Sequence, residues 1–294
     1  MLNLTKIAVD AMGGDGSPKK IIDGIIHNHK SNTQNFFIIF GNKNEIEPYI
    51  TDKIAKEFYK IIHTENMVKS TDSPLEAAKR GKDTSMWLAI NSVKNKEADI
   101  VISAGNTGAL LVISKLNLKM IENIDKPALS ALWPNKKGMS VVLDLGANIE
   151  CNSKNLVDFS IMGASLYKSL YPSNTPKIAL LNIGSEELKG NEIIKETFQL
   201  LNEKKFKNFD FSGYIEGNQL MDGNVNVIIS DGFTGNVALK TAEGTANFIT
   251  DELKMIFKGS ILGKISAILN YSNLNKFKKR LDPRLYNGAI FIGL

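Results

Sequence analysis

The fold of this chain is decided by the stretch VISAGNTGALL, residues 101–111, in which an apolar run ends, a glycine-containing turn follows and a second apolar run begins. The first run predicts a buried strand, and Asn106 or Thr107 is placed to cap the helix that starts there. A strand, a glycine turn and a helix in succession present unpaired amides at the positive end of a helix dipole, which is a natural anion site. A plain connecting turn gives the same pattern, so this loop alone leaves both interpretations open.

The same loop chemistry recurs four more times, each time after an apolar run and each time with glycine beside Asp or Asn. The four stretches are AVDAMGGDGSP (8–18), LDLGAN (143–148), LNIGSEELKGNE (181–192) and ISDGFTGN (229–236). In the first of them, Ser17 and Pro18 are expected to supply the cap and the first residue of a helix. Such loops at strand C-termini predict an open α/β sheet whose ligand lies outside the carboxyl ends of the strands.

Strands and helices alternate along the chain. Residues 35–40 and 58–64 read as buried strands, and residues 153–170 as a helix with one apolar stripe. The alternation predicts a three-layer α/β/α sandwich with a mostly parallel sheet. With 294 residues, 43% hydrophobic and 23% charged, the chain can form one α/β domain over 1–294, with or without a modest subdomain.

Several classes of protein are excluded by inspection. The lone Cys151 rules out an internal disulfide framework and favours a reducing, cytoplasmic location, and no secretory signal or long apolar run is present. The dinucleotide, P-loop, serine-elbow and zinc-protease motifs are absent. His27 and His29 are expected on the surface, and His63 as a buried, hydrogen-bonded side chain. We therefore expect no metal, no cofactor and no nucleic-acid partner.

Six motifs, in order and at natural spacing, resemble a known family. They are AVDAMGGD (8–15), RGKDTSM (80–86), SAGNTGALL (103–111), LDLGAN followed by Cys151, EELKGNE (186–192) and SDGFTGNVALKTAEG (230–244). Over nearly its whole length the chain resembles the PlsX family of bacterial phosphate acyltransferases. The resemblance implies transfer of a fatty acyl group from acyl-acyl carrier protein to inorganic phosphate, which gives acyl phosphate for phospholipid (phosphatidic acid) synthesis. It also implies a homodimer and a fold similar to those of phosphate acetyltransferases and isocitrate- or isopropylmalate-type dehydrogenases.

The resemblance and the chemistry of acyl transfer together indicate which residues are candidate catalytic groups. Phosphate is already a good nucleophile at neutral pH, so the site needs positioning and stabilisation of the oxyanion more than a strong base. Asn106, Thr107 and Gly108 would offer a helix N-terminus to the phosphate or the oxyanion. Lys189 would bring a positive charge to the phosphate or to the departing thiolate.

The other glycine loops supply candidate substrate- and phosphate-binding residues, although their aspartates serve equally well as helix caps or loop braces. These residues are Asp10, Gly13, Gly14, Asp15, Asp144, Asn148, Asp231, Gly232, Phe233, Gly235 and Asn236. Arg80 and Lys82 are typical of a phosphate contact or of a patch for the acidic carrier protein. A solvated helix face explains that pair as well.

Residues 251–280 form a basic amphipathic segment, in which seven Lys and Arg residues outweigh Asp251 and Glu252 for a net charge of +5. Gly259 and Ser260 should interrupt the helix, after which an apolar stripe follows: Ile261, Leu262, Ile265, Ile268 and Leu269. This pattern predicts reversible contact with anionic lipid, or else a helix that packs on a dimer partner. The resemblance implies delivery of product to a membrane glycerol-phosphate acyltransferase, which favours the lipid.

The last residues, YNGAIFIGL (286–294), resemble a family stretch YGGAPLLG, after which the family continues with a strand bearing a His-Gly motif and a final helix. We therefore expect this chain to lack that strand and helix. Two other functions remain as alternatives. A nicotinamide-dependent decarboxylating dehydrogenase would need a metal-binding aspartate cluster and an arginine set, which the sequence lacks. A non-catalytic membrane scaffold that binds acyl phosphate or carrier protein is left open.

Overall fold

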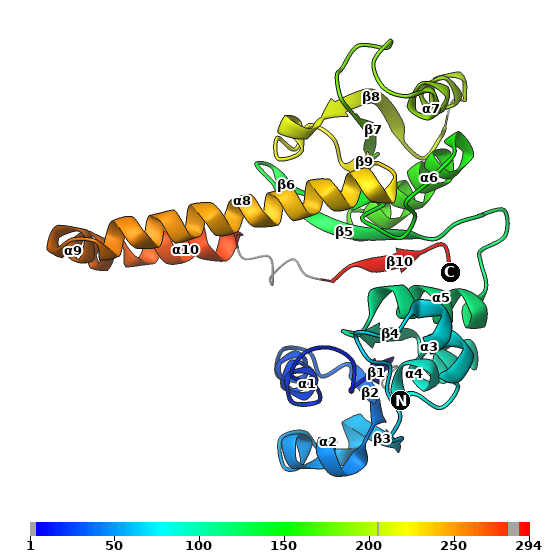
Figure 1. The fold of residues 1–294 in the computed structure, drawn as a ribbon, viewed down its shortest axis with the longest axis vertical. Coiled ribbons are helices and arrows are strands. Elements are labelled where there is room, and N and C mark those ends of the chain that lie inside the picture. The colour runs from blue at the N-terminus through cyan, green and yellow to red at the C-terminus, as the bar shows by residue number, and fades with distance from the viewer. Residues whose placement is uncertain (1–3, 205, 282–287) are drawn as a thin grey trace. The chain divides into compact units, whose positions relative to one another are not determined.

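The computed structural model describes residues 4–204, 206–281 and 288–294, and the chain divides into two compact units (Figure 1). The first unit comprises Met1–Ile121 with Leu294, and the second comprises Glu122–Gly293. Each unit has its own sheet, parallel throughout in the first and mostly parallel in the second. The predicted α/β class is confirmed. The sequence predicts one sheet in a single domain, with or without a modest subdomain, and the structure has one sheet in each of two units.

The sheet of the first unit has four parallel strands in the order β3-β2-β1-β4. They are β1 (Thr5–Asp10), β2 (Asn35–Gly41), β3 (Tyr59–His63) and β4 (Ile100–Ser103). The chain builds outward from β1 through β2 to β3 and then returns to place β4 on the other side of β1. The strand order therefore reverses between β1 and β4, which is where open α/β sheets bind ligands.

Helices cover both faces of this sheet. They are α1 (Lys19–Ser31), α2 (Lys43–Ile50), α3 (Pro74–Arg80), α4 (Ser85–Lys94) and α5 (Thr107–Leu118), with a short 3₁₀ turn η1 (Lys56–Phe58). Because side chains alternate along a strand, Ile7 and Val9 pack with Ile22 of α1, whereas Ala8 packs with Ala89 of α4. The alternation in β1 thus produces the two helical layers.

The start of α1 corrects one prediction. Ser17 does not cap the helix, because Pro18 occupies the cap position and no side chain bonds to the first turn. The Ser17 hydroxyl instead donates to the carbonyl of Gly13, at 2.5 Å. Ser17 is part of the glycine turn, so its hydroxyl is used there before the helix begins.

The sheet of the second unit has six strands in the order β10-β5-β6-β9-β7-β8. They are β5 (Ala128–Asn135), β6 (Gly138–Leu143), β7 (Lys177–Asn182), β8 (Asp210–Glu216), β9 (Val227–Ile229) and β10 (Ile290–Ile292). Strand β5 runs antiparallel to both of its neighbours, β6 and β10, and the remaining pairs are parallel. The loops after β6, β7 and β9 therefore emerge at the same edge of the sheet.

Helices also cover both faces of the second sheet. The covering helices are α6 (Ser153–Leu170), α7 (Glu192–Glu203) and α8 (Gly232–Lys258). The unit also contains α9 (Ile261–Leu269), α10 (Tyr271–Leu281) and a 3₁₀ turn η2 (Gly217–Gln219). Leu143 packs with Phe159 of α6, and Val142 on the opposite face packs with Leu239 of α8. Gly163 allows α6 to lie close to the sheet, because a Cβ there would be 2.6 Å from Val227. The predicted helix at 153–170 is confirmed.

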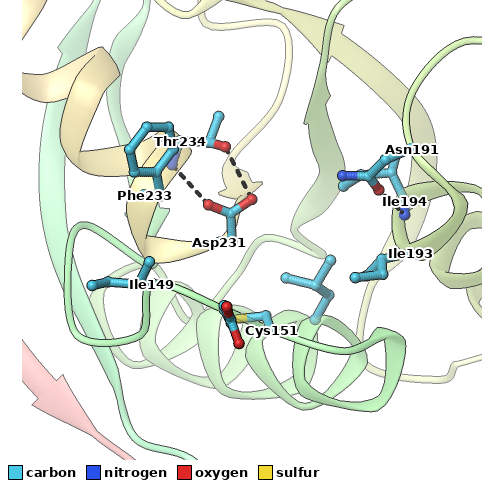
Figure 2. Close-up of a pocket in the computed structure, with 10 residues that line it drawn as sticks. Ile149, Cys151, Asn191, Ile193, Ile194, Asp231, Phe233 and Thr234 are labelled. Atoms are coloured by element: carbon cyan, nitrogen blue, oxygen red, sulfur yellow. Dashed lines mark hydrogen bonds between the residues drawn. The ribbon is translucent and has the colours of Figure 1, made fainter.

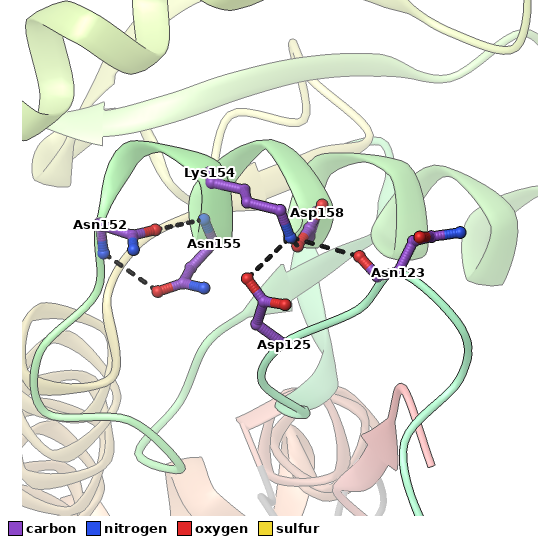
Figure 3. A network of polar contacts seen from close by, with 6 residues as sticks. All are labelled: Asn123, Asp125, Asn152, Lys154, Asn155 and Asp158. Atoms are coloured by element: carbon purple, nitrogen blue, oxygen red, sulfur yellow. Dashed lines mark hydrogen bonds and ion pairs between the residues drawn. The ribbon is translucent and has the colours of Figure 1, made fainter.

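The N-terminus of α6 is held by a network of polar contacts (Figure 3). Asn152 and Asn155 form a reciprocal capping box, each side chain accepting the other's backbone N–H. The ammonium of Lys154 lies 2.8 Å from Asp125 and 3.0 Å from Asp158, and hydrogen bonds to these carboxylates raise the pKa of Lys154. The loop that leads into α6 is thereby fixed to the segment before β5.

The segment 251–281, which we call the helical arm, continues α8 beyond the sheet of its own unit and folds back through α9 and α10 (Figure 1). The expected break is confirmed, because Gly259 ends α8 and Ser260 caps α9 by accepting the N–H of Gly263 at 2.9 Å. Among the described residues, no helix is both long and apolar enough to cross a membrane. The side chain of Arg280, and Tyr286 and Asn287 of the C-terminal motif, lie outside the described residues.

Candidate functional site

The first loop cluster is centred on the buried carboxylate of Asp10, at the C-terminal end of β1. It accepts hydrogen bonds from Ser85 Oγ and Ser103 Oγ, each at 2.6 Å, and from the backbone N–H of Met12 at 3.3 Å. Ser85 begins α4 and Ser103 ends β4. One carboxylate therefore joins three segments at the point where the strand order reverses.

The glycines of the first loop are required by a close approach of two backbones. A Cβ on Gly13 would lie 2.6 Å from Asp10 Oδ2 and 2.8 Å from the amide nitrogen of Gly105. Gly14 has φ +89°, and a Cβ there would collide with the carbonyl of Ala104. The loop after β1 thus packs directly on the loop after β4. Asp15 is exposed and has no hydrogen-bond partner within the described ranges.

The N-terminus of α5 is an open set of amide donors. Asn106 caps it, with Oδ1 accepting the N–H of Ala109 at 3.0 Å, while its Nδ2 donates to the carbonyl of Asp72 at 2.9 Å. The amides of Thr107 and Gly108 have no acceptor in the part of the chain that the structure describes. These first-turn N–H groups lie at the positive end of the helix, where an anion binds favourably. Both ends of the Asn106 side chain are engaged, one with the helix and one with the carbonyl of Asp72, so its role is to position the amides.

Arg80 lies at the C-terminal end of α3 and lines a cavity of about 400 Å³ in the first unit. Asp72, Glu76 and Asp83 line the same cavity, and within the described ranges no ion pair is formed by Arg80. Lys82 is exposed on the connection from α3 to α4. The carboxylates of this cavity outnumber its one guanidinium, so its charge does not favour phosphate.

The second loop cluster is centred on Asp144, which is fully buried after β6. Its Oδ1 accepts the N–H groups of Leu129, Gly146 and Ala147 at 2.9–3.1 Å. Its Oδ2 accepts both the backbone N–H and the side-chain amide of Asn148, each at 2.8 Å. The Asp144 carboxylate therefore stabilises the conformation of its own loop. Both of its oxygens are fully hydrogen-bonded, so it has no lone pair left to bind a ligand.

The loop after β9 lies against the loop of Asp144, and glycine makes this possible. A Cβ on Gly232 would be 2.6 Å from the carbonyl of Asn148, and one on Gly235 would collide with the carbonyl of Asp144. Asp231 caps α8 by accepting the N–H and the hydroxyl of Thr234, at 2.7 and 2.9 Å. The predicted residues of these two loops are therefore brought together. Among their neighbours, Phe233 and Asn236 are exposed.

Lys189 lies on the exposed loop after β7 in the second unit, whereas Asn106 and Thr107 belong to the first. Asn182, the last residue of β7, holds this loop because its Nδ2 donates to the carbonyls of Gly184 and Lys189, both at 3.1 Å. Gly190 has φ +97°, and a Cβ there would be 2.5 Å from Asn182 Oδ1. Within the described ranges the Lys189 ammonium forms no ion pair, so it is free to meet an anion.

A cavity of about 450 Å³ opens among the starts of α6, α7 and α8 (Figure 2). Its lining residues are Ile149, Glu150, Cys151, Leu156, Asn191, Ile193, Ile194, Asp231, Phe233 and Thr234. Burial, with a smaller effect of the Asp144 charge, raises the pKa of Cys151 to about 11. This cysteine is therefore a neutral thiol at neutral pH, and it is a weak nucleophile because the thiolate is the reactive form.

Sequence reasoning missed three residues that organise these loops: Ser85, Ser103 and Asn182. The two serines stand inside the motifs RGKDTSM and SAGNTGALL, and Asn182 is the second residue of the loop LNIGSEELKGNE. Their presence in those stretches was the available signal. The role of the serines was hidden because their partner Asp10 lies 75 and 93 residues away, whereas Asn182 bonds within its own loop.

Comparison with known proteins assigns the chain to a family. The sequence model of the family described as fatty acid synthesis protein matches residues 5–294. The chain belongs to this family. It is 74% identical over 294 residues to a phosphate acyltransferase of Pelagibacter ubique, covering 100% of this chain and 88% of that one. It is 41% identical over 299 residues to a phosphate acyltransferase of Maricaulis maris, covering 100% and 85%.

The resemblance to the PlsX family is thus confirmed, and the chain is a phosphate acyltransferase of fatty acid and phospholipid synthesis. The dehydrogenase alternative is wrong. Among solved structures, the fold is similar to that of the EutD phosphotransacetylase from Staphylococcus aureus, with a TM-score of 0.61 and 13% identity over 84% of this chain and 83% of that one. A phosphotransacetylase from Streptococcus pyogenes matches with the same TM-score and 16% identity, over 82% of each chain. The predicted likeness to phosphate acetyltransferase folds is confirmed.

Proposed function

We propose that this acyltransferase takes its acyl group from acyl-acyl carrier protein and gives it to inorganic phosphate. The observation that carries the proposal is the open N-terminus of α5, where the amides of Thr107 and Gly108 have no acceptor within the described ranges. Free amides at a helix N-terminus bind phosphate or stabilise the oxyanion of acyl transfer.

The proposed reaction is a direct displacement at the thioester. A phosphate oxygen forms a bond to the acyl carbonyl carbon, and the resulting oxyanion collapses to break the carbon–sulfur bond. The carrier protein leaves as a thiolate, which takes a proton from solvent, and acyl phosphate is the product. Direct attack fits the neutral Cys151, whose pKa of about 11 makes it a poor acyl acceptor. Lys189 would stabilise the phosphate or the leaving thiolate.

The experiment that tests this function is an assay of hexadecanoyl-acyl carrier protein with and without inorganic phosphate. We expect the thioester to be consumed only with phosphate, and acyl phosphate to be identified directly by mass spectrometry. Binding of the carrier protein without turnover would favour the scaffold alternative instead.

The role of Lys189 is tested by Lys189→Ala, which should lower kcat about 100-fold, as expected for loss of a charged contact made in the transition state. The matched control is Lys195→Ala on α7, where Lys195 pairs with Glu192 at 3.2 Å on the surface. We expect the control to keep the wild-type rate. A Lys189→Ala enzyme that reaches the wild-type rate at saturating phosphate would remove Lys189 from the mechanism.

We also propose that the helical arm makes reversible contact with anionic lipid. Gly263 of α9 packs on α8, since a Cβ there would be 2.9 Å from the carbonyls of Ile256 and Phe257. The opposite stripe is exposed: Ile261, Leu262, Ile265, Ile268 and Leu269. An exposed apolar stripe beside the lysines of α10 suits a membrane surface. On this proposal the protein is cytoplasmic and delivers acyl phosphate to a membrane glycerol-phosphate acyltransferase.

Sedimentation with vesicles tests the lipid contact. We expect binding to anionic vesicles at low salt, weak binding to neutral vesicles, and loss of binding after Ile265→Glu. A second copy of the chain is the competing occupant of the stripe, because the family resemblance implies a homodimer. Light scattering of the same variant separates the two: dissociation of a dimer by Ile265→Glu, without loss of vesicle binding, would assign the stripe to the partner.

A further inference from the structure

We propose that the cavity among the starts of α6, α7 and α8 holds the fatty acyl chain of the donor, an inference that rests on the proposed function. The cavity measures about 450 Å³, within the range of small-molecule sites. All of its lining residues belong to the second unit, and they come from the loops after β6, β7 and β9 and from the first turns of α6, α7 and α8. These loops and the start of α8 hold the candidate residues of that unit.

Five of the ten residues that line the cavity carry large apolar side chains. Leu156 and Ile194 are buried. The other three, Ile149, Ile193 and Phe233, are exposed to solvent (Figure 2). Exposed apolar surface in a concave site is costly in water, at about 25 cal/mol per Å². A hydrocarbon chain lying in the cavity would remove that surface from water.

The charges of the cavity do not suit inorganic phosphate, the other substrate. Glu150 and Asp231 contribute carboxylates, and the ten residues that line the cavity include no Lys or Arg. Phosphate would be repelled there, since it is anionic at neutral pH. The remaining polar groups are engaged or neutral: Asn191 caps α7, the Thr234 hydroxyl donates to Asp231, and Cys151 is a protonated thiol. Of the groups carried by the two substrates, the uncharged acyl chain is the one that fits this lining.

The test is the preference of the enzyme between a long and a short donor, hexadecanoyl- and butanoyl-acyl carrier protein. Ile193→Trp places a bulky ring in the cavity, and Ile193→Ala enlarges it. The matched control is Ile161→Trp on α6, because Ile161 and Ile193 are equally exposed at 38% and Ile161 does not line the cavity. Thermal unfolding of each variant checks that the fold is kept.

We expect Ile193→Trp to lower the ratio of kcat/KM for the long donor over the short donor by at least about 10-fold, since a filled pocket discriminates by size. Ile193→Ala should leave the long donor favoured, and Ile161→Trp should leave the ratio unchanged. A wild-type enzyme that makes acyl phosphate, and whose Ile193→Trp variant keeps the wild-type ratio, overturns this inference alone. A wild-type enzyme that makes no acyl phosphate from either donor overturns the proposed function, and this inference with it.

Discussion

The two units each contain a buried aspartate at the end of a strand, and the two are used differently. Asp144 in the second unit accepts five N–H groups, four of which come from residues 146–148 of its own loop. Asp10 in the first unit accepts two serine hydroxyls, from residues 75 and 93 positions further along the chain. The first arrangement shapes one loop, and the second joins three distant segments.

This difference matters for what each loop can do. Backbone donors cannot turn away when their acceptor is lost, so the loop of Asp144 depends strongly on that carboxylate. Hydroxyl donors rotate and find other acceptors, so the Asp10 cluster should tolerate more change. The rigid loop of Asp144 suits the wall of a cavity. Asp10 connects the ends of β1 and β4 to the start of α4, and this connection suits the positioning of the amides at the start of α5.

The largest expected effect is that of Asp144→Ala. It leaves several buried N–H groups without an acceptor, so we expect the second unit to lose about 3–5 kcal/mol of unfolding free energy. Urea unfolding measures it, because each unit holds one of the two tryptophans: Trp87 reports the first unit and Trp133 the second. Only the Trp133 transition should move. An unchanged urea midpoint would contradict the role given to Asp144.

The second-largest expected effect is on the alkylation rate of Cys151, which lies near Asp144 in the second unit. Its pKa is raised from 9.0 to about 11, mainly by burial, so at pH 8 the folded protein holds less thiolate than the unfolded chain. Alkylation by iodoacetamide at pH 8 should be about 100-fold slower in the folded state, because only the thiolate reacts. The gap should close as the pH rises toward 11. Equal rates in the folded and the urea-unfolded protein would place Cys151 outside the buried environment.

A smaller effect is expected for Asp10→Ala. The hydroxyls of Ser85 and Ser103 lose their acceptor but can rotate, so the first unit should lose about 2 kcal/mol. Here the Trp87 transition should move while that of Trp133 stays in place. A loss as large as that of Asp144→Ala would erase the distinction between the two aspartates.

The smallest effect is that of Ser103→Ala, which removes one donor to Asp10 and one acceptor for the N–H of Gly105, and leaves Ser85 and Met12 bonded to Asp10. We expect a loss of about 1–1.5 kcal/mol, because a typical hydrogen bond contributes about 1 kcal/mol net and the Gly105 N–H is only partly buried. A double-mutant cycle with Ser85→Ala sharpens the comparison, because the two serines share one carboxylate and their losses should not add. Strict additivity would mean that the three segments are not joined through Asp10.

Much of the fold was predictable from the sequence because its strands are short apolar runs followed by glycine. The strands β1, β2, β4, β6, β7 and β9 were located in this way. Strand β3 was located by its apolar residues alone, α6 by its apolar stripe and the break after α8 by Gly259 and Ser260. The prediction that β3 and β4 are buried is wrong, because both are partly exposed. Strand β5 was missed, since Pro134 within it argues against a strand and its residues are mixed in character. Strand β8 was missed because its residues, DFSGYIE, contain no apolar run and are interrupted by Gly213.

The sequence by itself determined the α/β class, the family and the loops that carry the candidate residues, because these depend on local apolar runs, glycines and motifs. Only the tertiary structure decided that β9 lies between β6 and β7, that the chain divides into two units, and that Asp10 bonds to Ser85 and Ser103. It also decided which apolar side chains surround the cavity above β6, β7 and β9. The physical reason is distance along the chain: a strand or a cap is fixed by its neighbours in sequence, whereas partners 75 or 93 residues apart meet only when the whole sheet has packed.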